Sequence, residues 1–424
     1  MDRNFINYNC KDSLVTALCA VELLKELKET GLEKFYFDIV HPLSKAIIGI
    51  NLRGVKVDDE ARLVAISSLT SEIQQGEEDV NSICGREVNI SGNSFRDYLY
   101  DEVGIPLIAG LGRSVNEDTL IKIIAKHPEM TDLCHLVLSI REKKKMVSTF
   151  LSSLTPGIDG RVHGNYRIGP VTGRLACTKP ALQQIPEGVC RSVFVAEKGK
   201  VFIYSDFSQV ELRIFAVLAQ DRSFLETFAS GTDIHDRNAR ELFRIPPEKT
   251  PTAVERYFAK TYIFGTLYGG SVESIKSRGA SAFKAITLDT MRQCQEAFLT
   301  AHPNMRLWRL EVEKELRTKK RLVNAFGRPR IFFGNIRDTI RQAYNFPIQS
   351  AAADLMNSKL IQIDKEYPNC LILQVHDSII LEVQEREAEK VERGVKRILE
   401  EEMPELNNYS FPVKMKTGRS WGEF

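Results

Sequence analysis

The chain has 424 residues, of which 43% are hydrophobic and 27% are charged, and its formal net charge is +2. This composition is ordinary for a globular protein of two or three domains, so any polyanionic partner must be met by local basic patches. The eight cysteines form no CxxC pair. No segment approaches roughly 18 uninterrupted apolar residues, and Met1 does not lead into a signal peptide. We therefore expect a soluble, reduced, cytoplasmic chain with no membrane partner.

The first third of the sequence is predicted to be mainly helical. Apolar residues recur at three- and four-residue steps over 12–30, which predicts a helix with Asp12 or Ser13 as its N-cap. The pattern is again helical from about 60 to 150. It ends with the basic run Arg141–Lys145, which predicts either a solvated helix face or a polyanion contact.

Strand-like segments occur in separate blocks along the rest of the chain. Residues 155–195 are rich in turn formers, and an apolar strand is predicted at 200–206. Residues 221–345 are helical, and 371–383 holds two β-branched runs around a short polar tip, which is typical of a hairpin. Strands in separated blocks with helical insertions predict an α+β fold rather than a wound βαβ array.

Two aspartates end apolar strands in this pattern. Asp206 closes the strand at 200–206, and Asp377 lies between His376 and Ser378 at the tip of the hairpin. A carboxylate where apolar walls meet solvent resists ionisation and favours a nearby cation. On adjacent strands, two such carboxylates are able to hold two divalent cations about 3.5–4 Å apart, the arrangement that clamps an in-line phosphoryl transfer. Taken alone, each aspartate is also compatible with a simple turn.

The segment 252–270 predicts a helix with an unusual face. Thr252 and Glu255 match a capping box, and Gly269 and Gly270 supply a stop. Between them, two cations and two aromatic residues recur every four positions, so they form one slowly winding stripe. The stripe consists of Arg256, Lys260, Phe264 and Tyr268. Cations followed by rings suit a nucleotide, with phosphates at one end and the base and sugar at the other.

Three segments now resemble a known family. They are Asp206–Arg213, Arg256–Gly269 and His376–Asp377, and they are similar to motifs A, B and C of the family A DNA polymerases, the bacterial DNA polymerase I type. Further matches are Thr172–Leu175, Leu182–Pro186, Asp233–His235, Asn345–Gln349, Ala352–Asp354 and Gly418–Trp421. The resemblance covers roughly residues 35–424, in the family's order.

The resemblance implies an α+β right-hand polymerase, with an antiparallel sheet in the palm and helical fingers and thumb. The implied segments are a remnant of the exonuclease domain's last helix at 1–30, palm at 31–66, thumb at 67–150, palm at 151–220, fingers at 221–345 and palm at 346–424. The implied partners are primer–template DNA and deoxynucleoside triphosphates, bound by a monomer that acts in DNA replication or repair.

The resemblance also implies roles for single residues. Asp206, Asp377 and the backbone carbonyl of Phe207 would bind two Mg²⁺ ions, for which Mn²⁺ can substitute, and Lys260 would protonate the pyrophosphate. The implied nucleotide-binding residues are Arg256, Lys260, Phe264, Tyr268, His235, Gln209 and Glu211, with Glu211 as a gate against a 2′-hydroxyl. The implied DNA-binding residues are Arg174, Gln184, Arg341, Asn345, Gln349, His376 and Lys145. The run Arg317–Arg321 would meet backbone phosphates as well.

One central residue departs from the family pattern. Ser378 stands where these DNA polymerases usually carry Glu, and His-Asp-Ser is instead typical of single-subunit phage-type RNA polymerases. Gln209, Glu211 and Phe264 follow the DNA enzyme, and a glutamate gate opposes ribonucleotide synthesis, so we expect DNA synthesis. The alternatives are an RNA polymerase, RNA-templated synthesis, and a non-catalytic primer–template binding module.

The N-terminal region suggests a lost activity. Tyr8 and Asp12 resemble the last motif of the 3′–5′ proofreading exonuclease, whose other carboxylates lie upstream in that family. Because one carboxylate cannot build a metal-dependent nuclease site, we expect no proofreading by this chain, and we expect Asp12 to serve as a helix cap.

Overall fold

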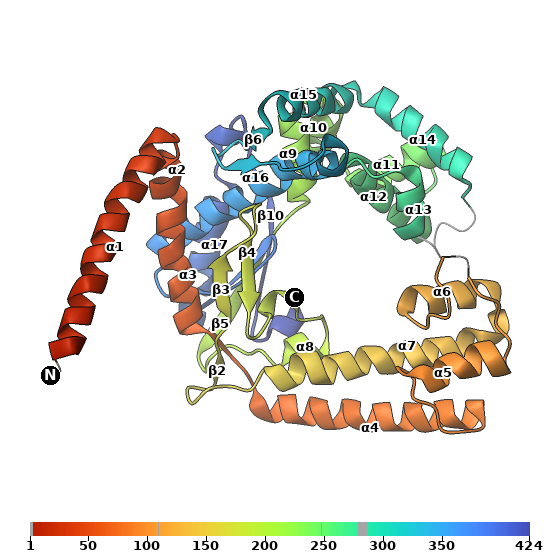
Figure 1. The fold of residues 1–424 in the computed structure, drawn as a ribbon. Helices are drawn as coiled ribbons and strands as arrows, with labels where there is room; N and C mark the ends of the chain where they lie inside the picture. The colour runs from red at the N-terminus through yellow and green to blue at the C-terminus, as the bar shows by residue number, and fades with distance from the viewer. Residues whose placement is uncertain (1–2, 109, 247, 279–285) are drawn as a thin grey trace.

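The protein is described by a computed structural model, which covers residues 3–108, 110–246, 248–278 and 286–424. Figure 1 shows helices gathered around one main antiparallel sheet, with a long helical pair on one side and a layer of helices on the other. The predicted α+β class is confirmed.

The central sheet has four strands in the order β10-β5-β9-β8, and every neighbouring pair is antiparallel. The strands are β5 (Lys200–Phe207), β8 (Leu371–Val375), β9 (Ser378–Gln384) and β10 (Val413–Gly418). Strands β8 and β9 form the predicted hairpin. The hairpin lies beside β5 in a register that sets Asp206 opposite Ser378. The side chains of β5 and β9 are buried on both faces of the sheet, so the sheet lies inside the main hydrophobic core.

Three two-stranded sheets complete the β structure among the described residues. They pair β1 (Val55–Lys56) with β2 (Arg161–Val162), β3 (Asn165–Ile168) with β4 (Leu175–Thr178), and β6 (Arg321–Val323) with β7 (Pro329–Ile331).

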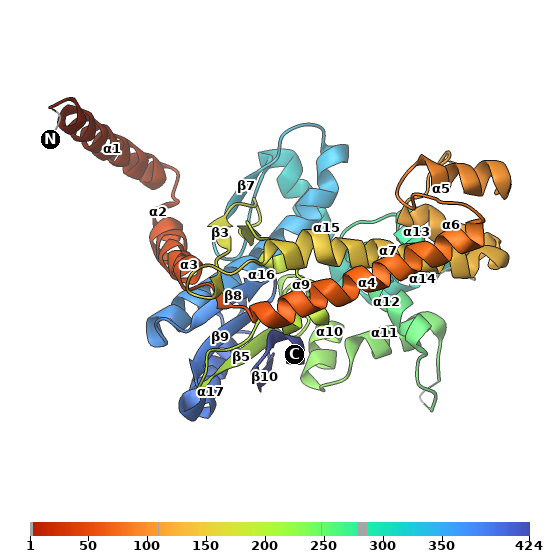
Figure 2. The ribbon, with the colours of Figure 1, turned by 90° about the horizontal axis from the view of Figure 1, so that it is seen from below.

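A pair of long helices has a hydrophobic core of its own. Helices α4 (Asp59–Cys84) and α7 (Thr131–Lys145) lie side by side in Figures 1 and 2. With α5 (Asn93–Asp97) and α6 (Glu117–Lys126) they enclose a second core that extends from Val80 to Ile140. Asp58 caps α4 by accepting a hydrogen bond from the backbone of Ala61. This separate core is the physical basis for treating the segment as a domain of its own.

The remaining helices pack on the sheet or on one another. Those before the sheet are α1 (Arg3–Glu29), α2 (Glu33–Phe35), α3 (His41–Arg53) and α8 (Val189–Ser192). Those after β5 are α9 (Val210–Leu218), α10 (Arg222–Ala229), α11 (Ile234–Phe243), α12 (Ala253–Leu267), α13 (Val272–Arg278), α14 (Leu288–Ala301), α15 (Pro303–Lys319), α16 (Ile336–Glu366) and α17 (Ala388–Glu400). Helix α17 packs on the central sheet, and α16 packs against α3, α9 and α15.

Helix α1 begins well before the N-cap that the sequence predicts. It extends away from the rest of the molecule in both ribbon views. The predicted cap is wrong, because α1 spans Arg3–Glu29 and Asp12 lies inside it, where its carbonyl accepts a hydrogen bond from the Thr16 hydroxyl.

Among the described residues, none of the helices combines the length and apolar character that a membrane crossing requires.

Two predicted domain divisions cross continuous helices. The division at 66/67 falls inside α4, and the division at 345/346 falls inside α16. The assignment of palm, thumb and fingers stays a prediction.

Candidate active site

The two predicted metal-binding aspartates come together at one end of the sheet. Asp206 lies near the end of β5, Asp377 lies in the turn between β8 and β9, and the backbone N–H of Phe207 donates to the Asp377 carbonyl at 3.1 Å. Burial raises the pKa of Asp206 to about 6, and the charge of Asp377 adds to this effect. Burial also raises the pKa of Asp377, helped by Glu211 and opposed by Arg174. Both carboxylates therefore lie where a cation stabilises their charged forms.

The tight turn that carries Asp377 is held by side chains beside it. His376 adopts a left-handed backbone conformation with φ +54°. The amide of Gln374 donates to the His376 carbonyl at 2.5 Å and accepts a hydrogen bond from Gln183 at 2.9 Å. Ser378 is 6% exposed, and its hydroxyl donates to the Val375 carbonyl at 2.8 Å. The position of Asp377 is therefore set by hydrogen bonds rather than by a free loop.

Glu211 joins three predicted site segments. Gln209 begins α9 in a left-handed conformation with φ +53°, which places Glu211 in the first turn of that helix. One carboxylate oxygen of Glu211 accepts a short hydrogen bond from Arg174, and the other accepts one from the Tyr268 hydroxyl. Burial, with the nearby Glu211 charge, raises the pKa of Tyr268 well above its ordinary value. The end of α12 is thus tied to the start of α9 through a hydroxyl that stays protonated.

The predicted stripe lies on α12, whose capping box of Thr252 and Glu255 is confirmed. Its two cations lie in different surroundings. Arg256 forms ion pairs with Asp233 at 2.5 Å and Asp236 at 2.7 Å, both at the start of α11. Lys260 is exposed and has no hydrogen bond or ion pair with any residue that the structure describes. Of the two, Lys260 is the cation that is open to a ligand.

The aromatic end of the stripe faces a buried histidine. His235 is 5% exposed, and burial lowers its pKa. Its Nδ1 atom has no hydrogen-bond partner among the described residues. The Phe264 ring lies 6.3 Å from the His235 ring and 6.3 Å from the Tyr268 ring. The structure therefore brings His235 from α11 together with the stripe of α12.

The predicted duplex contacts are spread over a wider surface. Arg341, Asn345 and Gln349 recur every four residues along one face of α16, and the Oδ1 atom of Asn345 is buried without a partner among the described residues. The side chain of Gln349 interacts with Tyr268, which links this face to the stripe. Gln184 is exposed in a short helical turn.

The two basic runs are largely paired. Lys143 binds Glu72 at 2.8 Å, and Lys144 binds Glu77, so these lysines join α7 to α4. Lys145 is exposed and lies over the Phe150 ring at 5.9 Å. In the other run, Arg317 and Lys319 are paired with the glutamates one turn earlier on α15.

Several residues that support the site were missed by sequence reasoning. Gln183 and Gln374 hold the Asp377 turn, and Asp236 holds Arg256. The sequence held one signal for this support: Gln374 is a polar residue within an otherwise apolar strand, and a buried amide requires hydrogen-bond partners. Asp236 gave no signal, since a solvated carboxylate in the first turn of a helix is common.

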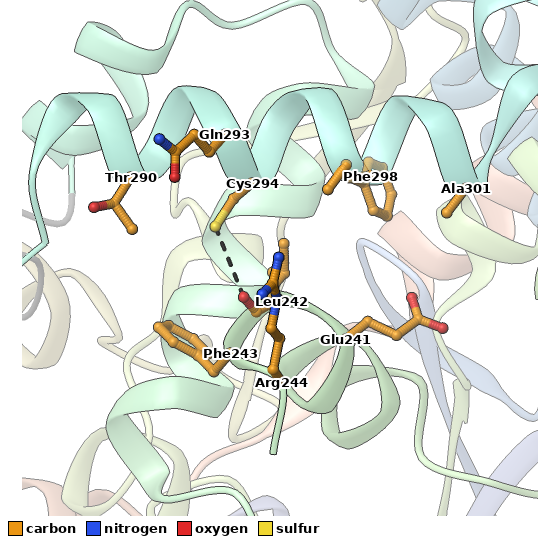
Figure 3. Close-up of a pocket in the computed structure, with 10 residues that line it drawn as sticks. Glu241, Leu242, Phe243, Arg244, Thr290, Gln293, Cys294, Phe298 and Ala301 are labelled. Carbon is orange, nitrogen blue, oxygen red and sulfur yellow. Dashed lines mark hydrogen bonds between the residues drawn. The ribbon is translucent and has the colours of Figure 1, made fainter. Parts of the chain in front are cut away.

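A cavity of about 580 Å³ lies between α11 and α14, away from the predicted site residues. Figure 3 shows Phe243 and Phe298 on opposite sides of this pocket, with Cys294 pointing toward the carbonyl of Leu242. That thiol donates to the Leu242 carbonyl at 3.8 Å.

Comparison with known proteins places the chain in a family. A family model described as DNA polymerase family A matches residues 62–423. DNA polymerase I of Thermus thermophilus is 30% identical over 97% of this chain and 52% of its own length, and that of Chloroflexus aurantiacus is 30% identical over 98% and 46%. The chain thus spans about half the length of the curated relatives that it matches. The solved polymerase domain of Pol1 from M. smegmatis, in complex with DNA primer-template and dNTP, superposes with a TM-score of 0.84 at 24% identity, over 94% of this chain and 73% of that one. The chain belongs to DNA polymerase family A.

Proposed function

We propose that this chain is a template-directed DNA polymerase that adds deoxynucleotides to the 3′-end of a primer by two-metal phosphoryl transfer. The observation that carries the proposal is the placement of Asp206 near the end of β5 beside Asp377 in the β8–β9 turn, with the pKa of both raised by burial. Family membership supports the same reaction class. The similar M. smegmatis domain, which was solved with DNA primer-template and dNTP, supports primer–template DNA and a deoxynucleoside triphosphate as partners.

The donor set fits Mg²⁺, which prefers carboxylate and carbonyl oxygens. Asp206, Asp377 and the backbone carbonyl of Phe207 would hold the ions, and Mn²⁺ has the same ligand preference. Bound there, the ions supply a more acidic primer hydroxyl and charge stabilisation for the leaving pyrophosphate. The raised pKa of each aspartate supports this assignment, because a cation offsets the cost of burying two like charges.

The stripe on α12 is suited to the triphosphate. Lys260, exposed and unpaired among the described residues, is placed to bind phosphate oxygens and to give a proton to the pyrophosphate. Arg256 adds a guanidinium for bidentate binding once it leaves its aspartates. The lowered pKa of His235 keeps its ring neutral at pH 7, so it acts as a hydrogen-bond donor rather than as a charge.

The surroundings of the sugar favour deoxynucleotides. Glu211 is held in place by Arg174 and Tyr268, so a 2′-hydroxyl beneath the sugar would meet a fixed carboxylate. Phe264 lacks the hydroxyl that a tyrosine would bring, which disfavours dideoxynucleotides. The duplex would lie along Arg174, Gln184, Arg341, Asn345, Gln349, His376 and Lys145, where contacts to the backbone and minor groove carry little sequence information.

Other properties belong to the same proposal. We expect a cytoplasmic monomer without membrane association. We also expect no 3′–5′ digestion by these residues, because Asp12, on the projecting helix α1, is a single carboxylate and cannot by itself build a metal-dependent nuclease site. Digestion by the purified chain that Asp12→Ala abolishes would contradict this expectation.

Primer extension tests the proposal directly. A labelled primer is extended on DNA and on RNA templates, with deoxynucleotides or ribonucleotides, by wild type and by Asp377→Ala. We expect wild type to extend the primer on the DNA template with deoxynucleotides but not with ribonucleotides, and the variant to bind the duplex without extending it. Equal extension by both proteins would overturn the catalytic assignment, extension with ribonucleotides would favour the RNA polymerase alternative, and duplex binding without extension by wild type would favour the binding module.

A further inference from the structure

A buried polar network lies behind Arg174 and takes no part in the proposed reaction. Its centre is Asp354 on α16, which is 0% exposed. The guanidinium of Arg328 donates to both carboxylate oxygens of Asp354, at 2.9 and 2.7 Å, and Asn324 donates to one of them at 2.8 Å. Asn357, one turn further along α16, donates to Asp354 at 3.3 Å. Every oxygen of this buried carboxylate therefore has partners, as a buried charge requires.

The network ends on the backbone of one glycine. The same amide of Asn357 donates to the Gly173 carbonyl at 3.0 Å, and the Gly173 N–H donates to the Pro170 carbonyl at 2.9 Å. Gly173 has φ +81°, and a Cβ atom there would lie 2.4 Å from Cζ of Arg328. Only glycine lets the guanidinium approach so closely, so the network and this turn are built to fit each other.

The Gly173 carbonyl belongs to the same rigid peptide plane as the backbone nitrogen of Arg174. Fixing that carbonyl therefore fixes where the Arg174 side chain starts. The side chain then reaches Glu211, which also accepts a hydrogen bond from Tyr268. Arg174 and Glu211 are both close enough to Asp377 to act on its charge. A line of hydrogen bonds and one peptide plane thus runs from α16 to Glu211, and the charges of Glu211 and Arg174 act on Asp377 beyond it.

We propose that Asp354 and Asn357 are positioning residues, which hold the Gly173 carbonyl so that Arg174 is aimed at Glu211 and the primer end. The proposal rests on the proposed polymerase function and gives a role to Asp354, which no step of that function uses. Stability alone is a weak reason for such a network, because a buried ion pair is often no more stable than well-packed apolar side chains. Directional bonds to one carbonyl instead restrict geometry, which is what a site with exact distance requirements needs.

A double-mutant cycle between Asn357→Ala and Arg174→Ala separates positioning from mere stabilisation. The readout is kcat/KM for incorporation of one deoxynucleotide, together with its ratio to the value for the matching ribonucleotide. We expect Asn357→Ala alone to lower kcat/KM by ~10- to 100-fold, the cost of a small misplacement of a reacting group, and to lower the ratio. In the Arg174→Ala background, Asn357→Ala should change kcat/KM by less than about twofold, because its effect acts through Arg174.

A matched control lies two residues away on the same helix. Lys359 is also 0% exposed, but its ammonium donates to the Glu401 backbone carbonyl at 3.2 Å and does not contact the Gly173 turn. Lys359→Met should lower the melting temperature without changing the ratio, and its effect should multiply with that of Arg174→Ala. If Asn357→Ala fails to fold, Asp354→Asn keeps the side-chain volume and enters the same cycle.

The outcomes are distinguishable. Multiplying effects of Asn357→Ala and Arg174→Ala, or a ratio unchanged in every network variant, would overturn the positioning role while leaving the polymerase proposal intact. Failure of wild type to incorporate any nucleotide would overturn the polymerase proposal itself, and the positioning role with it.

Discussion

Arg256 donates from its Nε atom to Asp236 at 2.7 Å, so the guanidinium predicted to bind phosphate is held by a carboxylate of the neighbouring helix. A second carboxylate, that of Asp233, binds the other edge of the same guanidinium. Under the proposed function, a triphosphate would have to replace these carboxylates before it gains the full attraction of Arg256. The start of α11 would then compete with the substrate for this cation.

Removing one competitor should strengthen nucleotide binding. We expect Asp236→Asn to lower KM for the deoxynucleotide about two- to fivefold with kcat unchanged, because an exposed ion pair is worth only a fraction of a kcal/mol to about 1 kcal/mol. Steady-state single-nucleotide incorporation measures both constants. The control is Glu241→Gln, which removes the Arg237–Glu241 pair on the same helix and should leave KM unchanged. An unchanged or higher KM in Asp236→Asn would contradict the competition.

Charge at Asp206 should cost stability when no cation is bound. Its pKa is about 6 in the folded protein against an ordinary value of 3.8, so the ionised form destabilises the fold. The loss builds up as the pH rises from about 4 to 6 and is complete at pH 7. Asp206→Asn should therefore raise the free energy of unfolding by ~1–2 kcal/mol at pH 7 in a chelator, and by little at pH 4. Denaturant titrations at both pH values measure this, and a less stable variant at pH 7 would contradict it.

Substitution of Ser378 tests whether the residue that departs from the family pattern affects the metal site. It lies opposite Asp206 in the sheet register, so a glutamate there would add a third carboxylate beside the pair. We expect Ser378→Glu to leave kcat near wild type but to change the Mg²⁺ concentration needed for half-maximal extension, the preference for Mn²⁺, or the error rate. Ser378→Gln matches the size without the charge and serves as control. Identical metal titrations and error rates for the two variants would show that the charge at this position does not matter.

Tyr268 should contribute to sugar selection through its hydroxyl alone. Tyr268→Phe keeps the ring but leaves Glu211, within the described part of the chain, with Arg174 as its hydrogen-bond partner, and we expect about 1–2 kcal/mol lower stability and a weaker preference for deoxynucleotides. Thermal melts and the incorporation ratio of deoxy- to ribonucleotides measure the two effects.

The control for this prediction lies on the same helix. Tyr262 is buried, and its hydroxyl donates to the Met291 carbonyl at 3.1 Å, away from Glu211. Tyr262→Phe should lose similar stability without changing the ratio. If both variants and wild type have the same incorporation ratio of deoxy- to ribonucleotides, the Tyr268 hydroxyl does not contribute to sugar selection.

The local features that carry the candidate site are readable from the sequence. The capping box at Thr252 and Glu255, the stripe on α12 and the hairpin around Asp377 depend on spacing within a short segment, so they are readable without the fold. The family also follows from such segments, because motifs of this kind are contiguous in the chain.

Which charged and polar groups meet became visible only in the folded chain. Glu211 receives Arg174 and Tyr268 from two distant segments, Arg256 is held by Asp233 and Asp236, and Asn357 reaches back to Gly173. Local periodicity says which face of an element is apolar, but the partner of a buried or half-buried polar group is set by which elements pack together. The expected cap at Asp12 failed for a related reason, since a helix that continues to Arg3 leaves that residue in its interior. The candidate site residues could thus be named from the chain, whereas the bonds that orient them come from packing between elements far apart in sequence.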